Sequence, residues 1–167
     1  MMDKILVNNK EYKVMSLLGK GKGGYSYLVM KDNQYFVIKQ IHHEPCSYYT
    51  FGNKLDSELN DYQRLSNINI RLPKLYEVDY KNERILKEYI EGPTIDCLVK
   101  KNKMKESFFE QVRSMAKTCF INNLNIDYYP TNFVVKDDIL YYIDYECNVY
   151  DPKWDFENWG IQYWINK

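Results

Sequence analysis

The hydrophobic pattern of this chain changes character at Gly92-Pro93. Before this point, five β-prone runs are separated by short polar turns: 11–18, 25–30, 35–41, 75–80 and 84–89. Helical spacing is found over 53–66 and, after Gly92-Pro93, over 94–101, 106–122 and 155–165, with a short hairpin over 133–143. The pattern therefore predicts a bilobal α+β chain. In this prediction, residues 1–91 form an antiparallel five-stranded sheet with one helix, and residues 92–167 form a mainly helical lobe.

Length and charge limit the classes of protein that fit this sequence. With 167 residues, the chain suits one compact unit or two small lobes that share one ligand cleft. The 23 Lys and Arg residues balance the 23 Asp and Glu residues, so no overall positive field attracts nucleic acid or an anionic membrane. No apolar run resembles a signal peptide or is long enough to cross a bilayer. We therefore expect a cytoplasmic protein with no membrane or direct nucleic-acid partner.

Four cysteines, Cys46, Cys97, Cys119 and Cys147, are widely spaced and form no C-x-x-C pair. This spacing favours reduced, mostly buried thiols over zinc ligation or a disulfide framework.

A glycine-rich segment, 19–24, matches the pattern G-x-G-x-x-G through Gly19, Gly21 and Gly24. Glycines allow backbone N–H groups to approach a phosphate closely. The β-prone run 25–29 follows, whereas a dinucleotide-binding loop or a Walker loop leads into a helix. The segment is therefore predicted to be the tip of a hairpin, and taken alone it is compatible both with a hairpin that binds no ligand and with one that approaches a phosphate.

Lys39 follows three apolar residues on a predicted strand, so its ammonium group projects from a half-buried sheet and needs a partner. Glu58 is the best candidate, because the same helix carries an apolar face that would dock against the sheet. Asp56, Asp61 and Glu44 are the other candidates, and solvated surface charges are the plain alternative.

Asp127, Asn132 and Asp144 form the second polar group. Asp127 and Asn132 flank a loop that contains a proline, and Asp144 ends an apolar strand, where a carboxylate needs a compensating cation. A carboxylate and an amide carbonyl are oxygen ligands suited to Mg²⁺, which leaves the second carboxylate to take a proton. Carboxylates with a purely structural role in turns are the alternative.

Taken in order, these segments resemble the protein-kinase-like superfamily. The resemblance covers roughly residues 12 to 165 and rests on the glycine segment 19–24, Val37-Ile38-Lys39, a hinge-like stretch 87–92, the spacing of Asp127 and Asn132, Asp144, and the D-x-W-x-x-G-like segment 155–160. The implied fold is bilobal, with a truncated C-terminal lobe.

The resemblance implies an ATP- and Mg²⁺-dependent kinase, that is, a transferase similar to protein Ser/Thr kinases. Lys39, paired with Glu58, would hold the α- and β-phosphates under the glycine segment, and the backbone of Glu88 and Ile90 would meet adenine.

The implied catalytic part would use the other residues. Asn132 and Asp144 would hold Mg²⁺, and Asp127 would orient and deprotonate a hydroxyl group of a protein or small-molecule acceptor.

Several features depart from protein kinases. Asn125-Ile126 replaces the His-Arg pair before the catalytic aspartate, and Tyr129 replaces a lysine. Only ten residues separate Asp144 from Asp155, too few for an activation segment. The pattern is closer to RIO, tRNA-modification-complex, aminoglycoside and lipopolysaccharide kinases. A pseudokinase that binds nucleotide or a partner without turnover is one alternative, and an unrelated nucleotide-free α+β domain is another.

The predicted C-terminal helix over 155–165 is apolar on two faces, one with Phe156, Trp159 and Tyr163, the other with Ile161, Trp164 and Ile165. Either the segments 106–122 and 147–154 cover both faces, or one face mediates a homodimer or binds a partner.

Overall fold

The computed structural model describes residues 3–21, 23–43 and 53–166. These residues form two units. The first contains residues up to 57 and 73–89, and the second contains 58–72 and 90 onward. Lys22, Glu44 and Cys46 lie outside the described residues. Helix α1 (Lys54–Asn67) begins in the first unit and ends in the second.

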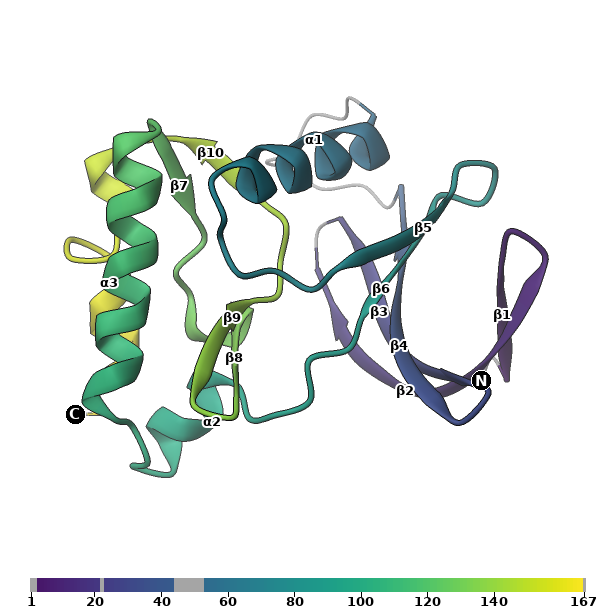
Figure 1. Ribbon diagram of the computed structural model, residues 1–167, viewed down its shortest axis with the longest axis horizontal. Coiled ribbons are helices and arrows are strands. Elements are labelled where there is room, and N and C mark those ends of the chain that lie inside the picture. Colours follow the sequence, from purple (N-terminus) through teal and green to yellow (C-terminus); the bar gives the residue numbers. More distant parts are fainter. Residues whose placement is uncertain (1–2, 22, 44–52, 167) are drawn as a thin grey trace. The chain divides into compact units, whose positions relative to one another are not determined.

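The first unit is built on one antiparallel sheet of six strands in the order β1-β2-β3-β4-β6-β5 (Figure 1). Their bounds are β1 Lys4–Val7, β2 Lys10–Lys20, β3 Gly24–Lys31, β4 Gln34–Ile41, β5 Leu75–Asp79 and β6 Arg84–Glu88. Two-residue turns with positive φ join β1 to β2, at Asn8-Asn9 (49° and 68°), and β3 to β4, at Asp32-Asn33 (51° and 63°). Asn and Asp tolerate this backbone region, which the right-handed twist of paired strands favours.

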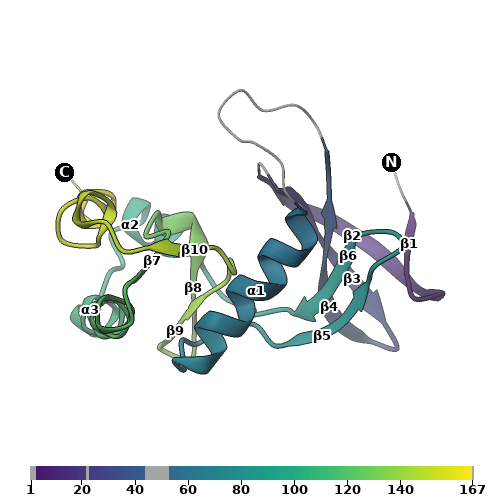
Figure 2. The ribbon, with the colours of Figure 1, turned by 90° about the horizontal axis from the view of Figure 1, so that it is seen from above.

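The sheet curls until its two edges meet, as the strands of the first unit show in Figure 2. The main-chain N–H of Asn8, in the β1–β2 turn, donates to Asp79 at the end of β5 (2.9 Å). Lys10 forms an ion pair with Glu77 (3.0 Å), and Arg84 donates to the Leu6 carbonyl (2.7 Å). Curling in this way covers edge strands that would otherwise expose unpaired backbone groups. Inside the curl lies an apolar core: Ile5, Val7, Tyr12, Val29, Ile38 and Leu86.

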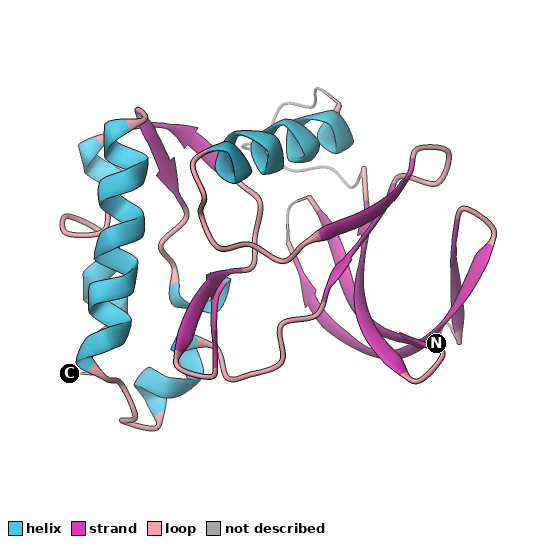
Figure 3. Cartoon of the chain, in the orientation of Figure 1, coloured by secondary structure: helices cyan, strands magenta, loops and turns pink. Residues whose placement is uncertain are grey.

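The second unit combines helices with two short strand pairs (Figure 3). Its helices are the end of α1, α2 (Ile95–Lys100) and α3 (Glu106–Ile121). Strand β7 (Leu124–Ile126) pairs antiparallel with β10 (Cys147–Val149), and β8 (Phe133–Lys136) pairs with β9 (Ile139–Tyr142). A separate core holds the unit together, and its largest fully buried side chains are Trp164, Tyr128, Tyr142, Phe133 and Phe156.

The fold class expected from the sequence is wrong in its architecture. The chain is α+β, but its sheet has six curled strands where five were expected, because β1 adds an edge strand that the sequence analysis did not predict. The second unit is not mainly helical: the whole described chain has three α-helices, and four strands lie between α3 and the C-terminal segment. The kinase-like bilobal fold is therefore not the fold observed.

The helix expected over 155–165 is also wrong. Only short 3-10 turns form there, at Pro152–Trp154 and Gly160–Tyr163. Trp164 is buried: its ring contacts Phe109 of α3 and Phe156, and its indole N–H donates to the Tyr128 carbonyl (2.8 Å). Trp164 is thus covered from within the unit, whereas Ile165 of the same predicted face is exposed.

Two smaller findings concern cysteines and membranes. The described cysteines, Cys97, Cys119 and Cys147, are free thiols, and the last two are buried. None of the helices in the described ranges has both the length and the apolar character required to span a bilayer.

Candidate functional site

The glycine turn between β2 and β3 is held by hydrogen bonds from the end of β4. Within the turn, the N–H of Gly21 donates to the Gly24 carbonyl (2.9 Å). The N–H of His42 donates to the Gly23 carbonyl (3.2 Å), and its Nε2 donates to the Gly21 carbonyl (2.8 Å). The ring of Tyr25 packs edge-on against the His42 ring, with centroids 5.2 Å apart. His42, which the sequence analysis did not single out, therefore helps to shape the turn.

The glycines of this segment serve different purposes. A Cβ added to Gly24 would lie 2.3 Å from the main-chain oxygen of Gln40, so the close approach of β3 to β4 requires glycine there. A Cβ added to Gly19 or Gly21 would meet nothing within 4 Å, and no described glycine has positive φ. The fold alone does not require glycine at 19 or 21, whereas a ligand that approaches the backbone would.

Lys39 lies beside this turn, and its role toward a phosphate stays a prediction. It is half-buried on β4, and its Nζ would be 3.6 Å from a Cβ added to Gly23. Glu58, its expected partner, belongs to the second unit, so the Lys39–Glu58 pair stays a prediction.

Two of the other candidate partners of Lys39, Asp61 and Asp56, lie in the described part of the chain. Asp61 accepts a hydrogen bond from the N–H of Cys147 (3.3 Å) and forms an ion pair with Arg64, both in the second unit. Asp56 is exposed in the first turn of α1. Asn53 caps that turn by accepting the N–H of Asp56 (3.1 Å).

The two residues expected to meet adenine lie where the units divide. The N–H of Glu88, at the end of β6, donates to the Lys74 carbonyl (2.9 Å), so this donor is already used inside the first unit. Ile90 is buried and is the first residue of the second unit after β6. Their role toward a nucleotide stays a prediction.

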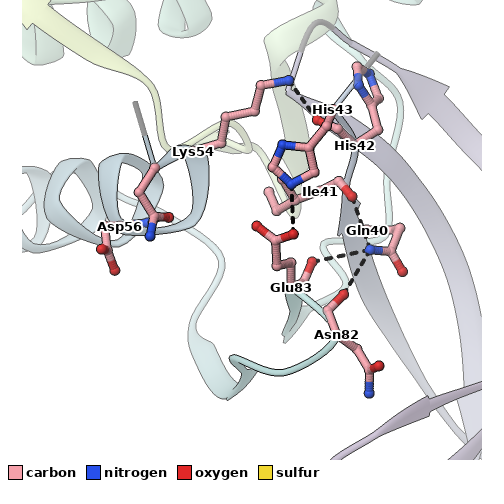
Figure 4. Close-up of polar contacts among 9 residues, drawn as sticks. Gln40, Ile41, His42, His43, Lys54, Asp56, Asn82 and Glu83 are labelled. Carbon is pink, nitrogen blue, oxygen red and sulfur yellow. Dashed lines mark hydrogen bonds and ion pairs between the residues drawn. The ribbon is translucent and has the colours of Figure 1, made fainter. Parts of the chain in front are cut away.

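Polar contacts also fix the end of β4, as Figure 4 shows. The buried Lys54, at the start of α1, donates to the His42 carbonyl (2.6 Å). The His43 ring faces Glu83 (2.7 Å), and the Gln40 amide donates to the carbonyl of Asn82 (2.9 Å). These contacts fix the main chain around His42, whose ring and N–H bond to the glycine turn.

In the second unit, the loop after β7 carries Asp127. One oxygen of its carboxylate accepts the N–H of Tyr129 (3.1 Å), a short turn that fixes the side chain. Its own main-chain carbonyl accepts a hydrogen bond from Nδ2 of Asn132 (3.3 Å). Asp127 and Asn132 are therefore joined directly.

Asp144 lies on the neighbouring segment. The N–H of Ile143, just before it, donates to the Asn132 carbonyl (2.9 Å), so the segment after β9 runs beside Asn132. The carboxylate of Asp144 is half-buried and accepts the N–H of Glu146 (3.4 Å). The structure thus brings Asp127, Asn132 and Asp144 together at one end of the β8–β9 hairpin.

A residue that sequence reasoning missed lies at the centre of this group. The hydroxyl of Tyr142 accepts the main-chain N–H of Asp127 (3.1 Å) and donates to the carbonyl of Glu146 (2.7 Å). In the sequence, Tyr142 is one apolar position of a strand, and no pattern distinguishes its hydroxyl from that of Tyr141.

The segment 155–160 packs against the loop that carries Asp127. A Cβ added to Gly160 would lie 2.6 Å from the Cβ of Tyr128, so glycine is needed for this packing. Asp155 accepts hydrogen bonds from the Tyr150 hydroxyl (2.8 Å) and from the N–H of Asn158 (2.8 Å).

The donor set at Asp127, Asn132 and Asp144 suits a metal that also binds its substrate. Within the described part of the chain, no group of three or more His, Cys, Asp or Glu side chains could hold a metal alone. Magnesium is usually held by one or two carboxylates together with substrate phosphates, and it prefers oxygen ligands. The carboxylate of Asp144 and the amide oxygen of Asn132 fit such a partial ligand set.

Comparison with known proteins adds no family: no family model matches the chain, and neither does any curated protein.

Proposed function

We propose that this chain is an ATP- and Mg²⁺-dependent phosphotransferase that moves the γ-phosphate to a hydroxyl group of a protein or small molecule. The observation that carries the proposal is the grouping of Asp127, Asn132 and Asp144 by main-chain and side-chain hydrogen bonds in the second unit. The proposal rests on these residues and not on the fold.

Each of the three residues has a chemical role that its surroundings support. The carboxylate of Asp127 is half-buried and held by the N–H of Tyr129, so it can orient a hydroxyl group and take its proton. Asn132 uses Nδ2 toward Asp127, and this orientation leaves its amide oxygen as the donor atom for a cation. With Asp144 it would hold Mg²⁺, which neutralises charge on the transferred phosphate.

The first unit supplies the second set of groups. Phosphate oxygens are bound by N–H donors and by cations, and Lys39 places a cation beside Gly23 of the glycine turn. His42 bonds to the carbonyls of Gly21 and Gly23, and contacts of this kind lower the entropy lost when a ligand binds beside them.

Nucleotide binding is the first test, by isothermal titration calorimetry with ATP, ADP and GTP in the presence and absence of Mg²⁺. The variant Lys39→Met should weaken Mg·ATP binding by about 10- to 100-fold, because it removes a charge-assisted contact. Lys13→Met is the matched control, since Lys13 is exposed on β2 and pairs with Met30, away from the glycine turn. Equal affinities in all three proteins would remove Lys39 from the site, and no binding in the wild type would overturn the proposal.

A further inference from the structure

We propose that Tyr142 is a positioning residue, whose hydroxyl holds the segment of Asp127 and the segment of Asp144 in one arrangement. Its meaning for catalysis rests on the function proposed above, whereas the structural link itself can be tested separately.

The ring of Tyr142 is fixed before its hydroxyl makes any contact. Tyr142 is the last residue of β9, opposite Phe133 of β8, and none of its surface is exposed. Its main-chain N–H donates to the Arg71 carbonyl (2.9 Å), and its ring packs against that of Phe133 with centroids 5.2 Å apart. Strand pairing and ring packing therefore fix the position of the hydroxyl oxygen.

At that place the hydroxyl makes two hydrogen bonds with defined directions. Asp127 supplies a main-chain N–H, which can only donate, and Glu146 supplies a main-chain carbonyl, which can only accept. The hydroxyl therefore accepts from the first (3.1 Å) and donates its single proton to the second (2.7 Å). Neither backbone partner can ionise, so the directions of both hydrogen bonds are fixed by the chemistry of the main chain.

The register of the neighbouring strands shows what this link does. In the β7–β10 pair, Ile126 lies opposite Cys147, so Asp127 and Glu146 are the next two residues in line. Their N–H and carbonyl would be the next ladder contact, but both turn to the Tyr142 hydroxyl. The hydroxyl thus bridges Asp127 and Glu146 just beyond the last paired residues of β7 and β10, where the segments that carry Asp127 and Asp144 begin.

Removing this oxygen should affect chemistry more than binding. In Tyr142→Phe the ring remains, but the N–H of Asp127 and the carbonyl of Glu146 lose their shared partner. Misplacement of a catalytic group by about 1 Å can cost about 100-fold in rate. We expect kcat to fall by about 10- to 100-fold, with a smaller rise in the KM for Mg·ATP, because Lys39 and the glycine turn are not altered whereas Asp144 belongs to one of the two linked segments.

Two readouts test the proposal, with Tyr141→Phe as the matched control. Tyr141 is the preceding residue on β9, half-buried, and its hydroxyl makes no hydrogen bond with the residues that the structure describes. The first readout is amide hydrogen exchange by NMR. The Asp127 amide should be protected in the wild type and should exchange at least about tenfold faster in Tyr142→Phe, but not in Tyr141→Phe. The second readout is the division of the effect between kcat and KM.

Each outcome decides a different statement. An unprotected Asp127 amide in the wild type overturns the proposal without any variant, even if Tyr142→Phe does not fold. Unchanged exchange in a folded Tyr142→Phe protein, or unchanged kcat in an active one, overturns it as well. If the wild type shows no turnover, the proposed function fails, and the exchange data alone decide whether Tyr142 links the two segments.

Discussion

The main-chain N–H of Asn8 donates to Oδ2 of Asp79 over 2.9 Å, and this bond joins the two edges of the six-stranded sheet. Asp79 is buried and also accepts the N–H and Nδ2 of Asn82 (3.0 and 3.1 Å). Burial alone would raise the pKa of its carboxyl group, but these hydrogen bonds, together with nearby Arg84, hold the pKa below its ordinary value. A buried carboxylate with three donors thus closes the curl.

The first prediction concerns this closure. Asp79→Ala should lower the free energy of unfolding by about 1–3 kcal/mol, because the N–H of Asn8 and the Asn82 donors lose a buried acceptor. Urea denaturation measures the change. Glu77→Gln is the matched control on the same strand, and its effect should be much smaller, because the ion pair of Glu77 with Lys10 is exposed.

The acid limb of the stability curve provides a check on the same site. A carboxyl group whose pKa is lower in the folded state stabilises the protein above its unfolded pKa of 3.8, and this contribution is lost as pH falls through the folded pKa. The stability difference between wild type and Asp79→Ala should therefore shrink below about pH 4. A difference that stays constant down to pH 2 would contradict the role given to the ionised carboxylate.

The second prediction concerns alkaline pH. Burial raises the pKa of the Cys119 thiol to about 11 and that of Cys147 to about 12, from 9.0 in the unfolded chain. Between pH 9 and the raised pKa of each thiol, the unfolded chain loses protons that the folded chain keeps. The free energy of unfolding should therefore fall as pH rises above 9. Thermal denaturation from pH 7 to 10.5, with reductant, measures this slope. Cys119→Ala should flatten it, and an identical slope in that variant would contradict the assignment.

The third prediction separates structural glycines from candidate ligand-binding ones. Gly160→Ala should destabilise the protein by about 1–3 kcal/mol, because the new Cβ would clash with Tyr128. Gly19→Ala should leave stability nearly unchanged, because a Cβ there meets nothing within 4 Å. If the glycine turn covers a phosphate, Gly19→Ala should weaken ATP binding in a protein of normal stability. Equal losses of stability in both variants would contradict this division.

Much of the local structure could be predicted because it depends on short-range signals. The hairpin at Asp32-Asn33 and the one at Asp137-Asp138 follow from residues that accept positive φ between two apolar runs. The helix over 106–122 follows from apolar spacing, and the observed α3 differs from it by one residue. The strand β1 was missed although Asn8-Asn9 is a turn signal of the same kind, since only four residues precede the turn in that strand.

The rest depends on tertiary contacts that leave no periodic signal. Residues 155–165 have helical spacing, but the buried Trp164 is held by the Tyr128 carbonyl, and the side chain of Asp155 bonds to the N–H of Asn158. Strands β7 and β10 have three residues each, too few for a pattern. The grouping of Asp127, Asn132 and Asp144 was predicted from their residue types and spacing, whereas the Tyr142 hydroxyl between their segments required the structure.

The central claim, phosphoryl transfer with Asp127 as the base, is tested most directly by following the γ-phosphate of radiolabelled ATP. The wild-type protein with Mg²⁺ should transfer the label to itself, to water or to an added hydroxyl acceptor. Asp127→Asn should bind Mg·ATP with unchanged affinity but lower the rate by roughly 10²- to 10⁴-fold. A wild-type protein that binds Mg·ATP and never transfers its phosphate, or an Asp127→Asn variant that transfers it at the wild-type rate, would contradict the account.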